Sequence, residues 1–429
     1  MPGVGVKLYS VFFKLLLKQR LSNSGNPHNE GYALIPLASN VSTPANAAFV
    51  DGVASKDVNI DPFTSLSLRI FLPQSALPNH SRAVFLGKVD HDEFGWDGHK
   101  NQLQLDVRSS DGQGNAHEHG YQGYVPSNTG SIHKKLPVML QFHGGAFITG
   151  AKDTLANDIF CRRMAKACNV IVIAVGYRLA SEHKCPAAYE DGFEALTWLA
   201  KQANLAECSK SATHVPAGFM HKGSDSYKEL VDSFGDSALE PWIAAHGDIT
   251  RTILLGVSSG GNIADHVTRM AIRAANSIEP VKVVAQALMY PFFLGKVQTR
   301  SEIKLANTYF YDKASCLLAW RLFLPDDEFD LDHPAVNPLN STREPPLKQM
   351  PPTLTVVAEL DWMKDRAIAY AEALRKAGVD APVLEYKDAV HEFATLDLLV
   401  KSRQAESCAE DMAIWIKKQI LAKGTEFSY

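Results

Sequence analysis

The stretch Ile253-Leu254-Leu255-Gly256-Val257-Ser258-Ser259-Gly260-Gly261-Asn262 joins an apolar run to a segment of helix-compatible composition. Its centre, residues 256–260, has the form G-x-S-x-G. In that form a serine lies on a sharp strand-to-helix turn, and the residues two positions away must be small because their backbones pass close together. The turn exposes the hydroxyl and directs the helix N-terminus toward negative charge that develops beside it. An ordinary glycine-rich turn explains this short pattern equally well by itself.

The composition is that of a folded protein of 429 residues, with 46% hydrophobic residues and a net charge of -4. This length allows one large α/β domain or two domains. The charge gives no electrostatic basis for nucleic-acid binding, so we expect no nucleic-acid partner. The cysteines form no C-x-x-C pair, and we interpret them as free thiols of a reducing compartment. They are Cys161, Cys168, Cys185, Cys208, Cys316 and Cys408.

Residues 6–21 have apolar positions at helical spacing, interspersed with basic residues. A signal peptide fits poorly, because Lys14 splits the apolar run and no small-residue cleavage site follows. No apolar run is long enough to span a bilayer. We therefore predict a cytoplasmic protein, with the nucleus as an alternative location, and no stable membrane insertion. A basic amphipathic helix can also touch a membrane surface, but we favour packing over the body of the protein.

Strand-like and helix-like segments alternate along most of the chain. Apolar runs predict strands at 137–142, 170–175, 251–257, 281–289, 353–358 and 383–386. Helical patterns occupy 153–167, 186–203, 261–275, 308–324, 364–377 and 404–421. These strands are apolar throughout, which is typical of a mostly parallel sheet covered by helices on both faces. Residues 66–72 alternate between apolar and polar and predict a further strand at the sheet edge.

The predicted domain organisation is an N-terminal helical segment at 1–50 followed by an α/β catalytic domain at 51–425. Segments at about 73–135 and 206–247 are rich in small and polar residues and predict flexible inserts. The first insert contains five histidines with irregular spacing and no cysteine partner, so we expect no metal site there. They are His80, His91, His99, His117 and His119.

A nucleophilic serine needs a base within hydrogen-bond reach and an acid that orients the base. In a parallel sheet these groups come from loops at the C-terminal ends of strands. Asp361 follows the predicted strand 353–358, and His391 follows the strand 383–386. The chain order Ser, Asp, His is the order found in α/β-hydrolases. We predict a triad of Ser258, Asp361 and His391.

Other residues compete for these roles, and Glu359 is set aside because it is still within the predicted strand or just leaving it. Asp365 is expected to cap the helix that follows it, which leaves Asp361 as the acid. His266 lies inside the helix after Ser258, and we interpret it as a surface or packing residue.

An oxyanion also needs hydrogen-bond donors, which are worth roughly 3–4 kcal/mol each where water is excluded. Gly144, Gly145 and Ala146 directly follow the strand 137–142 and offer backbone N–H groups. The N–H of Ser259, the residue after the nucleophile, completes the predicted oxyanion hole. His143 would brace this loop rather than act as a base.

Together these motifs resemble the hormone-sensitive-lipase-like branch of the α/β-hydrolases, and most of all the plant carboxylesterase subgroup to which the gibberellin receptors are related. The motifs are HGGAF (143–147), YRLASEH (177–183), PAAYED (186–191), GVSSGGN (256–262), YP (290–291), NP (337–338), DW (361–362) and His391. The resemblance implies an α/β-hydrolase fold with an N-terminal helical lid and no cofactor. It also implies a serine carboxylesterase that hydrolyses small-molecule esters through an acyl-enzyme.

The chain departs from the family pattern at several positions. The loop that usually reads His-Gly-Gly-Gly has Ala146 as its last residue, which keeps the N–H but adds a methyl group. Ser181 replaces a common proline, and Val257 and Ser259 replace a frequent Asp and Ala beside the nucleophile. None of these changes removes a catalytic group.

A second functional class shares this fold. The gibberellin receptors carry the same motifs but lose the catalytic histidine, and the resemblance therefore also allows a small-molecule hormone receptor with little or no hydrolysis. Because His391 is present, we favour the hydrolase. The sequence leaves the acyl and alcohol preferences and the oligomeric state open.

Overall fold

A computed structural model of the chain describes residues 41–61, 63–77, 123–126, 135–212, 239–307, 309, 311–395 and 402–425, together with 7, 10, 11 and 14. Most of the predicted helix at 6–21 lies outside these residues. So do most of the two segments predicted as flexible inserts, 73–135 and 206–247.

The described strands form one mostly parallel sheet in the order β1-β2-β4-β3-β5-β6-β7-β8. The first two strands run antiparallel to their neighbours, and the pairs from β4 through β8 are parallel. The bounds are β1 Val53–Asp61, β2 Leu66–Pro73, β3 Leu136–Phe142, β4 Ile171–Gly176, β5 Gly247–Val257, β6 Val283–Met289, β7 Thr353–Ala358 and β8 Val383–Tyr386. This architecture confirms the predicted α/β fold with a mostly parallel sheet.

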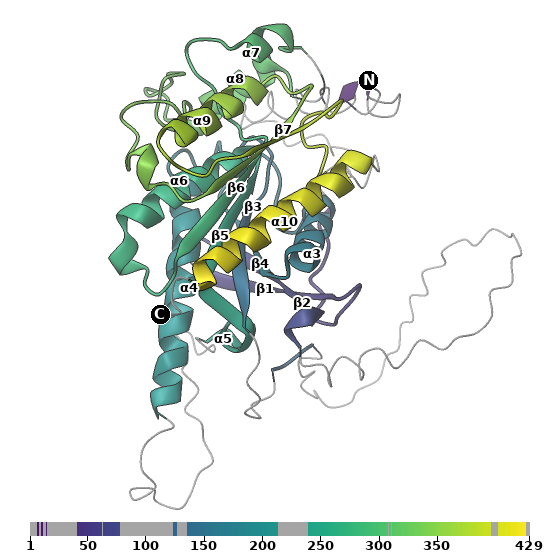
Figure 1. Ribbon diagram of the computed structural model, residues 1–429, viewed down its shortest axis with the longest axis vertical. Coiled ribbons are helices and arrows are strands. Elements are labelled where there is room, and N and C mark those ends of the chain that lie inside the picture. The colour runs from purple at the N-terminus through teal and green to yellow at the C-terminus, as the bar shows by residue number, and fades with distance from the viewer. Residues whose placement is uncertain are drawn as a thin grey trace, which may run out of the picture.

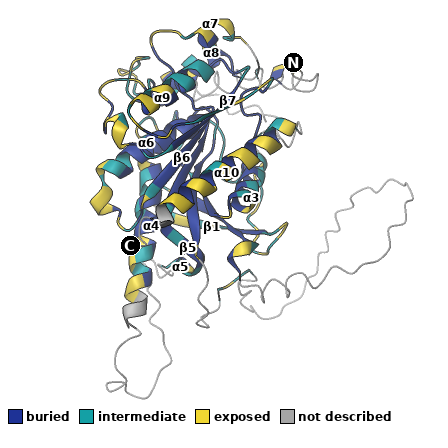
Figure 2. Ribbon diagram, in the orientation of Figure 1, coloured by how far each residue is buried: buried dark blue, intermediate teal, exposed yellow. Residues whose placement is uncertain are grey.

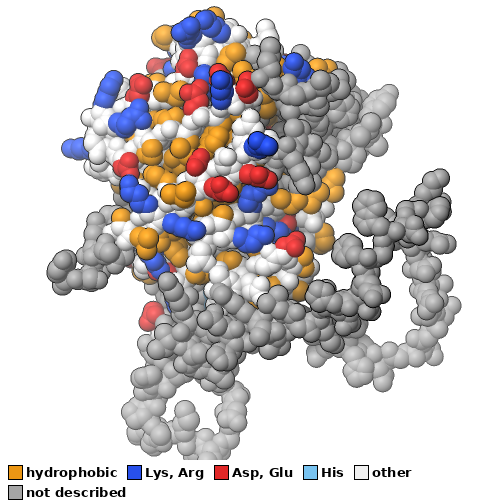
Figure 3. All heavy atoms as spheres, turned by 45° about the vertical axis from the view of Figure 1, so that its right-hand side comes forward, with side chains coloured by type: hydrophobic (Ala, Val, Ile, Leu, Met, Phe, Trp, Pro, Cys, Tyr) orange, Lys and Arg blue, Asp and Glu red, His pale blue; other side chains and the backbone are white. Residues whose placement is uncertain are grey.

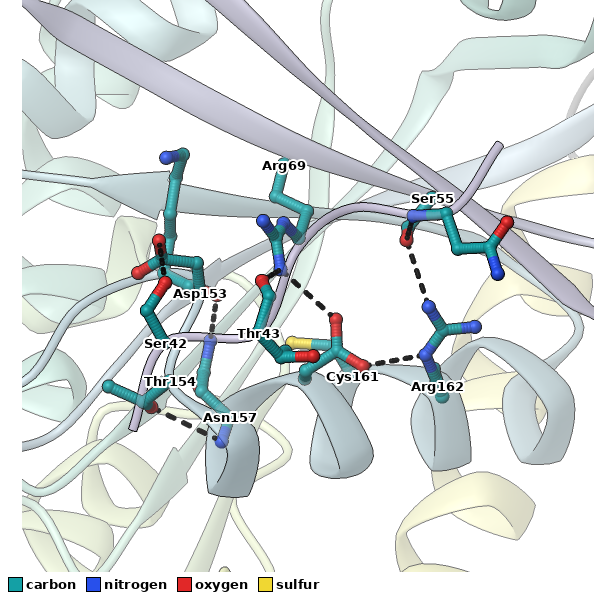
Figure 4. Close-up of polar contacts among 12 residues, drawn as sticks. Ser42, Thr43, Ser55, Arg69, Asp153, Thr154, Asn157, Cys161 and Arg162 are labelled. Atoms are coloured by element: carbon teal, nitrogen blue, oxygen red, sulfur yellow. Dashed lines mark hydrogen bonds and ion pairs between the residues drawn. The ribbon is translucent and has the colours of Figure 1, made fainter. Parts of the chain in front are cut away.

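The prediction that residues 66–72 form the sheet edge is wrong. β1 occupies the edge, and β2 lies between β1 and β4. Arg69 supplies one of the polar positions of β2 but is only 1% exposed, because its guanidinium pairs with Asp57 of β1 and with Asp158. Figure 4 shows this guanidinium between the strands and the helix that follows β3, where it also donates to the carbonyl of Thr43. In the apolar–polar alternation of residues 66–72, a buried arginine that pairs with carboxylates therefore has the same signal as a solvent-exposed residue.

Helices cover both faces of the sheet (Figure 1). α3, Leu155–Cys168, packs beside α10, Arg403–Thr425, which crosses in front of the strands in that view. α4, Ala187–Ala212, packs against α6, Ser259–Arg273, and both contact β5. Thr154 accepts a hydrogen bond from Asn157 N and caps α3. α4 continues past the predicted end at 203 into the segment predicted as an insert.

The remaining helices lie near the ends of the later strands. α9, Lys364–Lys376, packs on β7, and α7, Arg300–Lys304, contacts α9. α8, Lys313–Phe323, begins later than the predicted 308 because Asp312 caps it by accepting from Ser315 N. α7 and the short α5, Pro241–His246, were not predicted, because one or two turns are too short for periodicity to show.

The central strands form the core. Every residue of β3 and β7 is buried, and Figure 2 shows the strands as the dark layer beneath helices whose outer faces are exposed. The face in Figure 3 carries basic and acidic side chains interspersed over its described part. Among the described helices, none combines the length and apolarity needed to cross a membrane.

Candidate active site

Ser258 lies on the turn between β5 and α6, with φ 54 and ψ -115. This left-handed backbone is strained for a serine. The neighbours must be glycine, because a Cβ on Gly256 would lie 2.0 Å from Gly260 O, and one on Gly260 would lie 2.1 Å from Phe142 O. The close approach that the G-x-S-x-G spacing predicts is therefore present.

The structure brings Ser258, His391 and Asp361 together in one chain of hydrogen bonds. His391 Nε2 lies 2.9 Å from Ser258 Oγ, and His391 Nδ1 lies 2.7 Å from Asp361 Oδ2. With its proton on Nδ1, the imidazole donates to Asp361 and accepts from the serine hydroxyl. All three side chains are buried, on loops that follow β5, β7 and β8. The arrangement can activate a hydroxyl nucleophile.

Two opposing effects act on the pKa of His391. Burial favours the neutral imidazole, whereas the adjacent Asp361 carboxylate, with a smaller contribution from Glu392, favours the imidazolium. The carboxylates prevail and raise the pKa of His391 above its usual value. The imidazole is therefore well prepared to accept a proton inside a buried site.

The loop after β3 has an unusual backbone. Gly145, Ala146 and Phe147 have φ values of 119, 55 and 66. A Cβ on Gly145 would lie 2.1 Å from Thr149 O, so only glycine fits there. The alanine that replaces the family's third glycine adopts the left-handed conformation despite its methyl group. It is 4% exposed.

The next feature of the site is the set of backbone N–H groups predicted to form the oxyanion hole. Within the described part of the chain, no residue accepts a hydrogen bond from the N–H of Gly144, Gly145, Ala146 or Ser259. Ser259 is the first residue of α6, where N–H groups have no partner inside the helix. Ser259 adjoins Ser258 in sequence, and Gly144 lies near it in space, since a Cβ on Gly144 would lie 3.4 Å from Ser258 Cβ. These N–H groups can stabilise negative charge.

His143 supports this loop. Its Nδ1 lies 2.8 Å from Gly144 O, and its ring stacks on Tyr177 with centroids 4.2 Å apart. Tyr177 Oη also donates to the carbonyl of His143 over 2.8 Å. Burial lowers the pKa of His143 to about 4, so the ring stays neutral. The side chain is placed to brace the loop, and it bonds to no carboxylate among the residues that the structure describes.

Asp365 does not cap α9, contrary to the prediction. Met363 occupies the N-cap position without a side-chain bond, and Asp365 Oδ2 accepts from Ser301 N over 2.7 Å. Ser301 Oγ in turn donates to Trp362 O over 2.7 Å. Asp365 therefore joins α7 to the segment that carries Asp361, which no local pattern could indicate because the two partners are 64 residues apart.

Three residues at the site were not predicted from the sequence as site residues. Tyr177 belongs to a motif of the resemblance and stacks on His143. Glu392 directly follows His391 and is buried, with its carboxyl accepting from Tyr311 Oη. The sequence signal for Glu392 was a charged residue directly after the predicted base and before Phe393. Tyr311, whose ring packs edge-on against His391, carried no signal.

The side chains that could bind a metal ion are dispersed over the fold. Within the described ranges, no group of three or more His, Cys, Asp or Glu side chains is arranged to hold a metal ion. The five histidines of the predicted first insert lie outside the described residues. His266 is largely buried and stacks on Tyr189, which is a packing role.

Comparison with known proteins places this geometry in a family. The sequence matches the alpha/beta hydrolase fold family over residues 139–395. It is 56% identical to a probable carboxylesterase (number 11) of Arabidopsis thaliana and 55% identical to another (number 16), with full coverage of both chains in each case. A gibberellin receptor of the same plant is 33% identical over 81% of this chain and 74% of its own.

Solved structures agree on the fold. Carboxyl esterase 2 of Tuber melanosporum superimposes with a TM-score of 0.58 at 18% identity, covering 94% of this chain and 97% of that chain. An esterase of the archaeon Pyrobaculum calidifontis gives 0.54 at 20% identity, with 96% and 91% covered. The resemblance read from the motifs is confirmed. The chain belongs to the α/β hydrolase fold family, in the plant subgroup that holds these carboxylesterases and the gibberellin receptors.

Proposed function

We propose that the protein is a serine carboxylesterase that hydrolyses carboxylic esters of small molecules through an acyl-enzyme. The observation that carries the proposal is the hydrogen-bonded chain from Ser258 through His391 to Asp361. Relatives that match the whole chain are named probable carboxylesterases. The gibberellin receptors are more distant, and the presence of a hydrogen-bonded His391 favours hydrolysis over a purely receptor function.

Each group in the site has a step to perform. Ser258 Oγ attacks the ester carbonyl while His391 Nε2 takes its proton, and Asp361 stabilises the imidazolium. The N–H groups of the loop 144–146 and of Ser259 receive the oxyanion of the tetrahedral intermediate. The imidazolium then gives its proton to the leaving alcohol. A water molecule, deprotonated by His391, releases the acid and restores the serine.

The decisive experiment compares the wild-type protein with Ser258→Ala on p-nitrophenyl acetate. Loss of the nucleophile is expected to lower kcat by about 10⁴-fold or more. Ser277→Ala, which removes an exposed hydroxyl, is the matched control and should retain wild-type activity. A fluorophosphonate probe should label the wild type and the control but not Ser258→Ala. Equal hydrolysis by the wild type and Ser258→Ala would refute the esterase assignment and leave the receptor alternative.

We also propose that residues 1–50 form a helical lid over the catalytic domain, 51–425. Support comes from Lys14, whose Nζ donates to Asn307 O over 3.1 Å. Asn307 lies between α7 and α8, close in sequence to Tyr311. Deletion of residues 1–40 is expected to change KM for bulky esters more than kcat for p-nitrophenyl acetate. An unchanged KM across ester sizes would contradict a lid.

The proposed location is the cytoplasm, with the nucleus as the alternative. Support comes from the cysteines, which are all unpaired thiols. Fluorescence from a tagged full-length chain confined to the secretory pathway would exclude both locations.

A further inference from the structure

Glu392 is an unusual residue for its position. It directly follows His391, is 8% exposed, and has a φ of 60. A left-handed backbone is uncommon outside glycine, asparagine and aspartate, and a carboxyl group is costly to bury without good partners. Strain and a buried charge at one residue mark functional positions more often than structural ones.

The carboxyl reaches across to the oxyanion loop. A Cβ built on Gly144 would lie 2.7 Å from Glu392 Oε1 and 3.4 Å from Ser258 Cβ. Glu392 Oε1 and the nucleophile's side chain therefore approach the same point beside Gly144. The carboxyl lies between the loop that carries the base and the loop that carries the oxyanion donors.

This carboxyl has little hydrogen bonding of its own. Tyr311 Oη donates to Oε1 at 3.3 Å, and Oε2 receives no hydrogen bond from any residue in the described ranges. A carboxylate can accept about four hydrogen bonds, so most of this capacity is unused. Burial raises the pKa of Glu392, and His391 partly opposes that shift. The group is thus a buried carboxyl near the nucleophile with one long hydrogen bond and unused hydrogen-bonding capacity.

We propose that Glu392 is a specificity-determining residue, whose carboxyl binds a second hydroxyl group on the alcohol part of the ester. This inference rests on the proposed esterase function. The alcohol side is favoured because His391 gives its proton to the leaving alcohol, and Glu392 is the next residue. A hydroxyl suits this site because it can donate to a carboxylate or accept from a carboxylic acid, whereas an ammonium ion requires the ionised form.

The test compares esters that share an acetyl group. 2-Hydroxyethyl acetate and propyl acetate differ by one hydroxyl in place of a methyl. We expect the wild type to prefer the hydroxyl ester by about tenfold or more in kcat/KM, the effect of one hydrogen bond to a charged group. Glu392→Leu should reduce this ratio to near one, whatever its effect on the rate common to both esters. Glu392→Gln, which can still pair with a hydroxyl, should give an intermediate ratio.

Glu385→Leu is the matched control, because Glu385 is a partly exposed carboxylate on β8, the strand leading to His391. It should keep the wild-type ratio. A ratio near one in the wild type, or an equal ratio in the wild type, Glu392→Leu and Glu392→Gln, would overturn the inference. If Glu392→Leu does not fold, the ratio in Glu392→Gln decides.

A cation site at Glu392 would give a different substrate preference. A wild-type preference for acetylcholine over its neutral analogue 3,3-dimethylbutyl acetate, without a hydroxyl preference, would overturn the hydroxyl assignment. Ser258-dependent hydrolysis of propyl acetate without any effect at Glu392 would refute this inference alone. An absence of Ser258-dependent hydrolysis of every ester would refute the proposed function instead.

Discussion

Two histidines face the same site from opposite loops, and their environments differ in one respect. His143 and His391 are 4% and 2% exposed, and each lies at the C-terminal end of the sheet. His143 stacks on a tyrosine and bonds to a carbonyl oxygen, and burial lowers its pKa to about 4. His391 bonds to a carboxylate, which raises its pKa despite equal burial.

The difference shows that an adjacent carboxylate, rather than burial, decides which histidine can take a proton. A buried imidazole beside neutral groups remains neutral and can only support the backbone. A buried imidazole beside Asp361 stabilises positive charge for as long as the proton is held. The loop that holds the proposed oxyanion donors thus contains a histidine that stays neutral and does not compete with His391.

The largest effect is expected from His391→Ala. Removal of the base should lower kcat on p-nitrophenyl acetate by about 10⁴-fold or more, since the serine then has no proton acceptor. The control is His333→Ala, a partly exposed histidine of the loop after α8. Steady-state kinetics with folding checked by circular dichroism would measure the effect. Retention of activity within tenfold of the wild type would mean that His391 is not the base.

The next largest effect on activity is expected from Asp361→Asn. It removes the carboxylate and keeps the shape, and kcat should fall by about 10³- to 10⁴-fold. The pKa of His391 in the wild type is raised, so the acid limb of the pH–activity profile should lie above the ordinary histidine pKa of about 6.5. Without the carboxylate, burial dominates, and the acid limb of kcat/KM should move to lower pH. An unmoved acid limb in the residual activity would contradict this account.

His143→Phe should have a smaller effect. The ring can still stack on Tyr177, but the Nδ1 contact with Gly144 O is lost, and about 1–3 kcal/mol of support for the loop is removed. We expect a fall in kcat of about 10- to 100-fold. The acid limb of the pH profile should stay in place, because this histidine takes no proton. A shift of the acid limb would contradict the claim that His391 takes a proton and His143 does not.

The smallest predicted effect concerns stability in acid. The pKa of His143 is about 4 in the folded protein and about 6.5 when unfolded, so the unfolded chain binds more protons between these values. The contribution of neutral His143 to the free energy of unfolding is fully present above pH 6.5 and is lost as the pH falls toward 4. When the pH is lowered from 7 to 5, protonation of this histidine in the unfolded chain should lower the free energy of unfolding by about 2 kcal/mol. Urea unfolding should show a smaller pH dependence for His143→Phe, and an identical dependence would contradict the assignment.

Sequence patterns were sufficient to predict the features of the fold and the candidate site that depend on neighbouring residues in the chain. The glycines around Ser258 follow from steric exclusion, because a Cβ on Gly256 would lie only 2.0 Å from Gly260 O. The strands were visible as continuous apolar runs because both faces of the sheet are covered. Asp361 and His391 could be selected because each lies in the loop after a strand that the sequence predicts.

Local patterns failed where a polar residue is satisfied by a distant partner. β1 was missed because it is an edge strand with polar residues along one side. β2 was misplaced at the edge because Arg69 is buried through pairing with Asp57 and Asp158. Asp365 resembled a helix cap, but Ser301 from another helix takes its carboxylate.

The sequence by itself determined the family, the sheet and the candidate triad, because backbone sterics, burial and chain order at strand ends leave their marks in local residue choice. Only the tertiary structure decided how charge is distributed around the site. Among the described residues it placed a carboxylate against His391 and none against His143, and it brought Glu392 beside Gly144 across more than two hundred residues of chain. Electrostatic effects depend on distances in space, and sequence separation does not report those distances.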